Sequence, residues 1–499
     1  MAKLSKAFVN ENKLSEKLSG PINGWAQLPE KVLQFGTGVL LRGLPDYFID
    51  KANQQGVFNG RIVVIKSTDK GGTDEFSDQD SLYTLHIKGI ENGREVQESK
   101  LISSISRVLI AAKHWKEILD IATKEELELI ISNTTEVGIN LDVEDDLKAL
   151  PPTSFPAKLT ALLYKRFLHF RGDKHKGLVI LPTELISDNG TKLKEIVIEL
   201  SRIHDLGEDF ITWLNEANYI CNTLVDRIVP GKLPREEQAY EEQQLGYKDN
   251  LAILAEPFRL WAIESSSDRV AEVLSFSKVD KGIFIVPDIG KFKELKLRLL
   301  NGSHTFSCGL AMLCGFSTVK EAMKSKDFLL YLQLLLQDEI IPAIIGKDIS
   351  EGEALDFAAN VIDRFKNPFL NHQWQSIGFN YTSKVQMRTV ALIENYARKQ
   401  QTVPHYMALG FAAYLLFMKD EVNSGCDEQS SLLAVLWEGN NPNELVDKVL
   451  ENQELWRTDL SAITGFAEAV KKYLQLLMNN NALDIVKQVN ENRTINNEK

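Results

Sequence analysis

The stretch Lys31-Val-Leu-Gln-Phe-Gly36-Thr-Gly38-Val39 decides the fold of the first part of the chain. An apolar run ends at Phe35, two glycines follow, and a helical pattern then continues from Val39 to about Gln54. This order of strand, glycine turn and helix is typical of dinucleotide-binding domains, in which backbone N–H groups receive a pyrophosphate. The residues predicted to contact the cofactor here are Phe35, Gly36, Thr37 and Gly38.

The turn departs from the full dinucleotide-binding fingerprint at two places. Leu41 stands where a third glycine is expected, and Arg42 after it could reach a phosphate instead. The second strand, 61–66, has no ribose-binding acid at its end, and the nearest carboxylate is Asp69. A basic Lys66 would tolerate a 2′-phosphate, so residue chemistry alone leaves NAD and NADP both open.

Further buried runs at 127–131 and 177–181 are separated by helical periods. Strands that alternate with helices indicate a parallel sheet covered on both faces. We therefore predict an α/β, Rossmann-like, doubly wound domain over residues 1–286. Asn133 and Thr134 follow one of these strands and are further candidates for cofactor binding.

After Pro287 the strand patterns give way to helical periods rich in Leu, Ala and Met. We predict a mainly α-helical domain over residues 287–499, with the site between the two domains. The longest apolar run, 407–418, is shorter than the roughly twenty residues of a membrane-spanning helix. It is therefore expected to be a buried helix.

Composition excludes several classes of protein. The chain has 57 basic and 69 acidic side chains, a net charge of −12, which disfavours nucleic acid as a partner. Its 4 cysteines contain no CxxC pair, and the amino terminus has no signal-peptide core. We expect a cytoplasmic protein, not bound to a membrane, with a small-molecule substrate; monomer and homodimer both remain open.

The segment Lys296-Leu-Arg-Leu-Leu-Asn301-Gly-Ser-His304 carries the densest chemistry. At about 100° per residue of an α-helix, Lys296, Asn301 and His304 would share one stripe. Reduction of a ketone needs donors on the carbonyl oxygen and an acid that supplies a proton. Asparagine amides can donate to the carbonyl oxygen. A lysine can supply the proton if burial lowers its pKa. Asn222 is another candidate amide, although all these residue types are also common on exposed surfaces.

Motifs of other catalytic classes are absent from the sequence, namely HExxH, GxSxG, GxxxxGK[ST] and Cys/His groups at zinc spacing. We therefore expect no metal in the reaction. A dinucleotide-binding sensor without catalysis is the alternative from another class. Such a sensor would keep the two glycines of the turn but would not need the lysine, the asparagines and the histidine.

With these residues the chain resembles the mannitol dehydrogenase family, the long-chain, metal-independent polyol dehydrogenases, over nearly its whole length. The resemblance is carried by the sequence segments 34–42 and 222–228. It is also carried by Lys296, which Asn301 follows after five residues and His304 after three more. Within the family the chain is most similar to the branch that interconverts tagaturonate and altronate. That closer similarity is carried by the segments 132–138, 182–186 and 300–305.

The resemblance implies NAD-dependent, reversible reduction of the keto-uronate tagaturonate to altronate in hexuronate catabolism. It implies that Lys296 is the general acid–base and that Asn222 and Asn301 form the hole for the carbonyl oxygen. The substrate-binding residues that it implies are Asn222, Glu264, Asn301, His304 and Lys384. Fructuronate and a mannitol-type polyol remain alternative substrates.

Two positions depart from the polyol enzymes that the chain resembles. Ser376 stands where they carry an arginine, and Ser265, after Glu264, stands where they carry a pocket aspartate. Both departures count against mannitol, and loss of the aspartate removes a repulsion of the uronate carboxylate. The candidates for the cation that holds this carboxylate are Lys384, Arg388 and Arg259.

Overall fold

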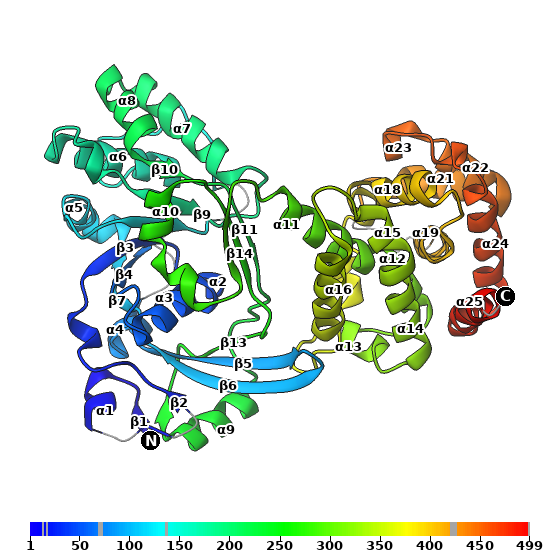
Figure 1. Cartoon of the computed structure of the whole chain (residues 1–499), viewed down its shortest axis with the longest axis horizontal. Helices are drawn as coiled ribbons and strands as arrows, with labels where there is room; N and C mark the ends of the chain where they lie inside the picture. The colour runs from blue at the N-terminus through cyan, green and yellow to red at the C-terminus, as the bar shows by residue number, and fades with distance from the viewer. Residues whose placement is uncertain (12–13, 16–17, 68–72, 135–137, 420–426, 498–499) are drawn as a thin grey trace. The chain divides into compact units, whose positions relative to one another are not determined.

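The computed structural model describes the chain except for residues 12–13, 16–17, 68–72, 135–137, 420–426 and 498–499. The chain forms two compact units, which Figure 1 draws from blue to red along the sequence. The first unit comprises Met1–Lys88 and Glu95–Ile289, and the second comprises Gly89–Arg94 and Gly290–Lys499. The short segment Gly89–Arg94 thus belongs to the second unit although its neighbours in sequence belong to the first.

The first unit is built on a six-stranded parallel sheet with the strand order β10-β9-β8-β3-β4-β7. Its strands are β3 (Glu30–Phe35), β4 (Arg61–Lys66), β7 (Ile105–Ile110), β8 (Leu129–Ser132), β9 (Val179–Pro182) and β10 (Tyr219–Ile220). The strand order reverses between β3 and β8, and in such sheets ligands bind outside the carboxyl ends of the strands at this switch point. The predicted Rossmann-like, doubly wound fold is confirmed.

Apolar side chains of the sheet alternate between two faces, as the two-residue period of a strand requires. Leu33 and Val63 belong to a core cluster with four helices, whereas Val32 and Val64 belong to the cluster on the other face. The four helices are α5 (Ala111–Ile121), α6 (Phe155–His169), α7 (Asn189–Ile203) and α8 (Glu208–Ala217). The other face is covered by α3 (Pro45–Gln54) and by a three-stranded sheet of β11 (Thr223–Asp226), β14 (Leu260–Glu264) and β15 (Ile283–Val286).

The unit also contains a two-stranded sheet, β1-β12, and a four-stranded sheet, β13-β5-β6-β2, whose long hairpin is drawn in light blue in Figure 1. The strands of the four-stranded sheet are β2 (Leu18–Ser19), β5 (Tyr83–Glu91), β6 (Arg94–Ile102) and β13 (Ile253–Ala255). The remaining elements of this unit are β1 (Ala2–Lys3), α1 (Lys6–Glu11), α4 (Asp74–Asp78), α9 (Arg235–Leu245), β12 (Tyr247–Lys248) and α10 (Asp268–Val273), with short 3-10 turns at Trp25–Gln27, Lys174–Lys176 and Ser275–Val279.

The helix predicted over 39–54 is interrupted in the structure. Helix α2 (Val39–Gly43) ends before Leu44, and α3 begins at Pro45. Proline is well suited to the first turn of a helix, but it has no N–H with which to continue one. Gly43 packs closely on Val229, because a Cβ at this glycine would stand 2.8 Å from Cγ2 of the valine. The break therefore separates the short helix after the glycine turn from the buried helix of the core.

From Gly290 onward, the regular elements of the second unit are helices in its described residues. Its elements are α11 (Gly290–Leu295), η4 (Lys296–Gly302), α12 (Ser303–Leu313), α13 (Val319–Ala322), α14 (Lys326–Leu334), η5 (Leu335–Ile340), α15 (Ile341–Ile344), α16 (Glu351–Phe365), α17 (Trp374–Ile377), α18 (Tyr381–Gln400), α19 (His405–Phe417), α21 (Ser430–Gly439), α22 (Pro442–Leu450), α23 (Gln453–Trp456), η6 (Leu460–Ala462), α24 (Phe466–Asn479) and α25 (Ala482–Asn497). Helix α19 packs on α12 and α24 and is buried at nearly every position. The predicted buried helix over 407–418 is thereby confirmed.

Candidate active site

The glycine turn joins β3 to α2 at the carboxyl end of the sheet. Gly36 has a φ of +129°, and a Cβ there would stand 2.9 Å from the carbonyl oxygen of Asn133, so a side chain would be strained and would clash. Gly38 is exposed, and a Cβ built on it meets no atom within 4 Å. Thr37 between them is half-buried. The turn therefore lies tightly against the next strand end and borders open space beside it, which fits a bound dinucleotide.

The ends of β8 and β9 are tied together beside this turn. Nδ2 of Asn133 donates hydrogen bonds of 3.0 Å to the carbonyl oxygen and the Oγ1 of Thr183. The backbone N–H and the Oγ1 of Thr134 donate to Oε1 of Glu184 at 2.9 and 3.0 Å. Glu184 is buried and orders this edge, a role that we did not predict; its place in a polar cluster after a strand was the available signal. Asn133 and Thr134 thus flank the switch point of the sheet.

Two residues predicted to contact the cofactor have side chains inside the unit. Phe35 is fully buried, so its backbone is the part that reaches the turn. The guanidinium of Arg42 donates to the carbonyl oxygen of Leu251 at 2.7 Å and lies 5.3 Å from the ring centre of Tyr83. The guanidinium of Arg42 thus has partners inside the unit, and its contact with a phosphate stays a prediction. Asp69, a further predicted contact, lies outside the described residues.

Asn222 directly precedes β11 and is oriented by its neighbours. Its Oδ1 accepts the backbone N–H of Thr191 at 2.9 Å, and its Nδ2 donates to Oγ1 of Thr191 at 3.1 Å and to Oε1 of Glu264 at 2.9 Å. The other oxygen of Glu264 accepts the N–H of Ile289 at 3.3 Å. Both hydrogens of the Asn222 amide are thus engaged, so donation to a substrate oxygen requires one of them to change partner.

Lys296 and Asn301 lie in η4, a π-helical segment between α11 and α12. The stripe predicted at α-helical spacing is therefore corrected. In a π-helix each N–H bonds the carbonyl five residues earlier, so residues five apart are neighbours on successive turns. Lys296 and Asn301 have this spacing and are both half-buried. The structure brings the two groups to one side of the segment by a different helix from the one predicted.

His304 lies in the first turn of α12 and is buried. Its ring stacks on Phe365, with centroids 4.1 Å apart and planes 11° apart, and meets His372 edge-on at 5.3 Å. Burial lowers the pKa of His304 well below its ordinary value, and electrostatic repulsion from His372, Arg364, Arg388 and Lys384 lowers it further. The imidazole is therefore neutral near pH 7, which favours hydrogen bonding over proton donation from a cation.

The three predicted candidates for the carboxylate-binding cation differ in their surroundings. Lys384, on α18, donates to the carbonyl oxygen of Ile377 at 2.8 Å, and burial and then the neighbouring Arg388 lower its pKa. Arg259 lies in the first unit, where its Nε stands 3.0 and 2.9 Å from the two carboxylate oxygens of Asp280. Because Arg259 already has Asp280 as a carboxylate partner, we do not assign this arginine to the carboxylate of the substrate.

The described candidates therefore form two groups, one in each unit. The glycine turn, Asn133, Thr134, Asn222 and Glu264 belong to the first unit. Lys296, Asn301, His304, Lys384 and Arg388 belong to the second.

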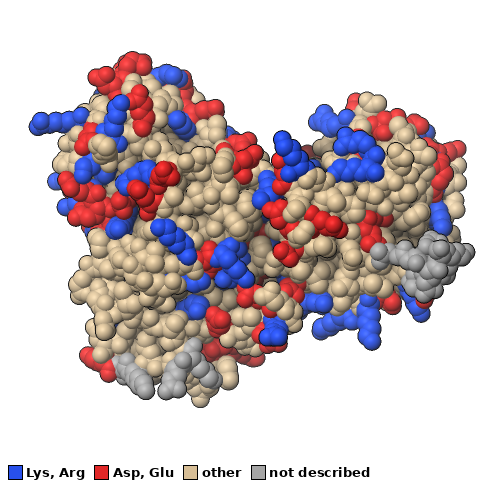
Figure 2. Space-filling view, in the orientation of Figure 1, with Lys and Arg blue, Asp and Glu red and all other residues tan. Residues whose placement is uncertain are grey.

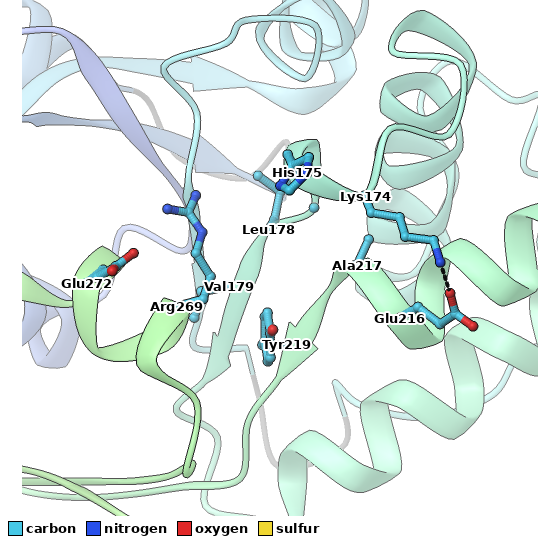
Figure 3. Close-up of a pocket in the computed structure, with 10 residues that line it drawn as sticks. Lys174, His175, Leu178, Val179, Glu216, Ala217, Tyr219, Arg269 and Glu272 are labelled. Carbon is cyan, nitrogen blue, oxygen red and sulfur yellow. Dashed lines mark hydrogen bonds and ion pairs between the residues drawn. The ribbon is translucent and has the colours of Figure 1, made fainter.

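A cavity of about 420 Å³ opens at the opposite, amino-terminal edge of the sheet (Figure 3). It lies at the start of β9 and β10, and charged side chains from neighbouring segments line it. These charges include Lys174, paired with Glu216, and Arg269, which lies 3.6 Å from Glu128. None of the described site residues lines this cavity, so we do not assign the reaction to it.

Surface charge and hydrophobicity add two observations. On the face that Figure 2 shows, acidic and basic side chains are interspersed over parts of both units. Among the described residues, no helix has both the length and the apolar character needed to cross a membrane.

Comparison with known proteins gives matches over almost the whole chain. The family model of the mannitol dehydrogenase Rossmann domain matches residues 30–274, and that of the mannitol dehydrogenase C-terminal domain matches residues 288–478. The altronate oxidoreductase of Bacillus subtilis is 37% identical over 455 residues, which cover 90% of this chain and 93% of the relative. That of Bacteroides thetaiotaomicron is 36% identical over 471 residues, which cover 93% and 97%.

Two solved structures have the same fold. The mannitol 2-dehydrogenase of Pseudomonas fluorescens, in a ternary complex with NAD and D-mannitol, superposes with a TM-score of 0.69 at 20% identity, over 98% of this chain and 99% of that one. A D-sorbitol dehydrogenase in substrate-free form superposes with a TM-score of 0.76 at 19% identity, over 97% and 99% of the two chains.

Proposed function

Because the chain belongs to the mannitol dehydrogenase family, we propose that it is an NAD-dependent oxidoreductase that reduces tagaturonate to altronate and catalyses the reverse oxidation. The observation that carries the substrate is the 36–37% identity to altronate oxidoreductases over at least 90% of the chain. The solved polyol dehydrogenases are more distant, at 19–20% identity, and support the fold alone.

We assign the cofactor to the switch point of the six-stranded sheet. The backbone at Gly36, Thr37 and Gly38 lies at this point, next to the strand end that carries Asn133 and Thr134. The open space beside Gly38 and the obligatory glycine at position 36 support this assignment. When bound, NADH supplies the hydride for the reduction.

Proton transfer is assigned to Lys296. As the ketone carbon gains the hydride, the ammonium group of Lys296 gives a proton to the ketone oxygen, which yields the secondary alcohol of altronate. In the oxidation, the neutral amine of Lys296 takes this proton back. A lysine suits both directions because its amine carries no charge after the proton has left.

The amides of Asn301 and Asn222 are assigned to the ketone oxygen. Each donates a hydrogen bond where negative charge develops, and neither titrates. For Asn222 the step requires the loss of its contact with Thr191 or with Glu264. His304 is neutral and its Nε2 is buried with no partner among the described residues, so it is suited to a hydroxyl group of the substrate.

The test is the oxidation of NADH by the purified protein, followed by absorbance, with tagaturonate, fructuronate and fructose in parallel and with NADPH as the second cofactor. We expect the highest kcat/KM with tagaturonate and NADH. A preference for fructuronate would overturn the substrate but keep the mechanism. Binding of NADH without turnover of any ketone would overturn the enzyme and favour the sensor.

We also propose that the protein works in the cytoplasm. The described cysteines, Cys221, Cys308 and Cys314, are free, which suits the reducing compartment expected from the sequence. Light scattering on the same purified protein distinguishes the monomer from the homodimer.

A further inference from the structure

Two positive side chains on α18, Lys384 and Arg388, act electrostatically on His304 in the second unit. We propose that Arg388, together with Lys384, binds the carboxylate of the substrate and so selects sugar acids over neutral sugars. This inference rests on the proposed function, because it places the charged end of the substrate in the same site as the ketone.

The two cations lie on one face of α18. They are four residues apart, a spacing that places side chains one above the other on a helix. Nη1 of Arg388 stands 3.4 Å from Oγ1 of Thr305, the residue that follows His304. Nζ of Lys384 contacts the backbone of Ile377. Because the charges of both cations act on the imidazole of His304, both lie within electrostatic reach of it.

Neither cation has a carboxylate partner among the described residues, since the contacts of Arg388 and Lys384 are to a hydroxyl and a backbone carbonyl. Burial lowers the pKa of each, and Arg388 lowers that of Lys384 further. Charged groups removed from water are normally paired with an opposite charge. The pair therefore lacks an anion, and the planar fork of an arginine fits a carboxylate with two parallel hydrogen bonds.

A buried acceptor or donor next to the pair also lacks a partner. Nε2 of His304 is inaccessible to solvent and has no hydrogen-bond partner in the described part of the chain. A buried polar atom of this kind costs stability unless a ligand or water satisfies it. A polar molecule bound at His304 would satisfy this orphan atom.

The segment that carries Lys296 is fixed against the same helix. Nη1 of Arg298, within η4, donates to the carbonyl oxygens of Met387 and Arg388 at 2.9 and 3.0 Å. Gly302 at the end of η4 packs closely on α18, because a Cβ there would stand 3.2 Å from Cδ1 of Leu392. The proton donor and the proposed carboxylate site are therefore held at a set spacing within one unit, which suits a substrate that carries its ketone and carboxylate at different positions.

The test compares Arg388→Met with Arg398→Met, a matched control on the same helix whose exposed guanidinium donates a hydrogen bond to Asn395. The quantity measured is the ratio of kcat/KM for tagaturonate to that for fructose. We expect Arg388→Met to lower this ratio by roughly 10- to 150-fold, the usual range for the loss of a hydrogen bond to a charged group. Most of the fall should appear in KM for tagaturonate, and Arg398→Met should leave the ratio at the wild-type value.

A second measurement, the thermal midpoint with and without ligand, tests the carboxylate site separately from the proposed reaction. It also remains informative if one variant folds poorly. Altronate should raise the thermal midpoint of the wild type more than the uncharged altritol does, and Arg388→Lys should keep part of this difference. Equal losses for tagaturonate and fructose, or an altronate effect that survives in Arg388→Met, would overturn the role of Arg388.

If the wild type does not turn over tagaturonate, the proposed function fails, and a panel of aldonates and uronates in the thermal assay still tests the carboxylate site. Absence of any Arg388-dependent preference for acids in that panel would overturn it as well.

Discussion

Arg259 in the first unit and Arg388 in the second are both half-buried arginines, but their partners differ. Arg259 is paired with Asp280, which also accepts a hydrogen bond of 2.8 Å from Lys51. Arg388 has one long contact to a hydroxyl. An arginine that is paired with a carboxylate of its own unit supports the fold, whereas an arginine without an internal anion is available to a ligand. Burial of a cation alone therefore does not distinguish the two roles.

We propose that Lys296, like Arg388, acts on the substrate from the second unit, and Lys296→Ala is the most demanding test of this proposal. We expect kcat to fall by about 10²- to 10⁴-fold, because the ketone oxygen loses its proton donor. Binding of NADH, measured by fluorescence, should stay close to that of the wild type. Lys291→Ala, a neighbouring lysine paired with Glu353, is the matched control. Retention of most of the activity in Lys296→Ala would refute the mechanism.

Removal of Asp280, the partner of Arg259 in the first unit, should lower the stability of the fold but leave the substrate specificity unchanged. The side chain of Asp280 is fully buried, and removal of one partner from a buried ion pair costs about 3–5 kcal/mol. We therefore expect Asp280→Asn to lower the unfolding midpoint by several degrees while the preference for tagaturonate over fructose is kept. A specific rise in KM for tagaturonate would instead return Arg259 to the carboxylate site.

Asp46 is a buried acid without a full ion pair, and its contribution to the stability of the fold falls as the pH rises. Burial raises the pKa of Asp46 to about 8, against the opposing effects of Gln34 and Arg42. A carboxyl group whose pKa is raised on folding stabilises the fold below its unfolded pKa of about 4 and loses that contribution as the pH rises through its folded pKa. The thermal midpoint of the wild type should therefore fall relative to that of Asp46→Asn between pH 5 and pH 8.5. Parallel curves for the two proteins would contradict this assignment.

The smallest effect is expected at an exposed pair. The hydrogen bond from Lys291 at 2.7 Å, followed by those from Ser350, lowers the pKa of Glu353 to about 2, but Glu353 is largely exposed. Exposed ion pairs contribute about 0.2–1 kcal/mol, and solvent and salt screen them. Glu353→Gln keeps the capping box with Ser350, because glutamine also serves at this position. We expect a loss below about 1 kcal/mol in urea unfolding that vanishes in high salt; a loss that persists there would mean that the cap itself is damaged.

The parallel sheet and its glycine turn could be predicted because local periodicity determines them. Apolar runs of strand length, each followed by a polar or glycine turn and a helical period, have few other solutions in a doubly wound sheet. The break at Pro45 has a local signal too, since proline ends or starts helices. These features depend on neighbours in sequence, so the sequence carries them directly.

The partners of the charged residues could not be predicted, because they are distant in sequence. Arg42 stands beside the glycine turn, yet its carbonyl partner is Leu251, more than two hundred residues later. The same holds for Arg259, whose carboxylate partner Asp280 lies on another segment. The π-helix at η4 could not be predicted for another reason. Over only seven residues, hydrophobic periodicity does not distinguish a π-helix, with hydrogen bonds between residues five apart, from an α-helix, with hydrogen bonds between residues four apart.

The π-helical segment also bears on attempts to stabilise the protein by design. A π-turn amounts to an extra residue within an otherwise α-helical run, and it is held at some cost in regular hydrogen bonding. Deleting one residue between Lys296 and Asn301 would let the run continue from α11 into α12 as an ordinary helix. Lys296 and Asn301 would then be four residues apart in an α-helix and would still be neighbours on successive turns. A one-residue deletion among these seven residues therefore regularises the hydrogen bonding while it keeps the two site residues on one side of the helix.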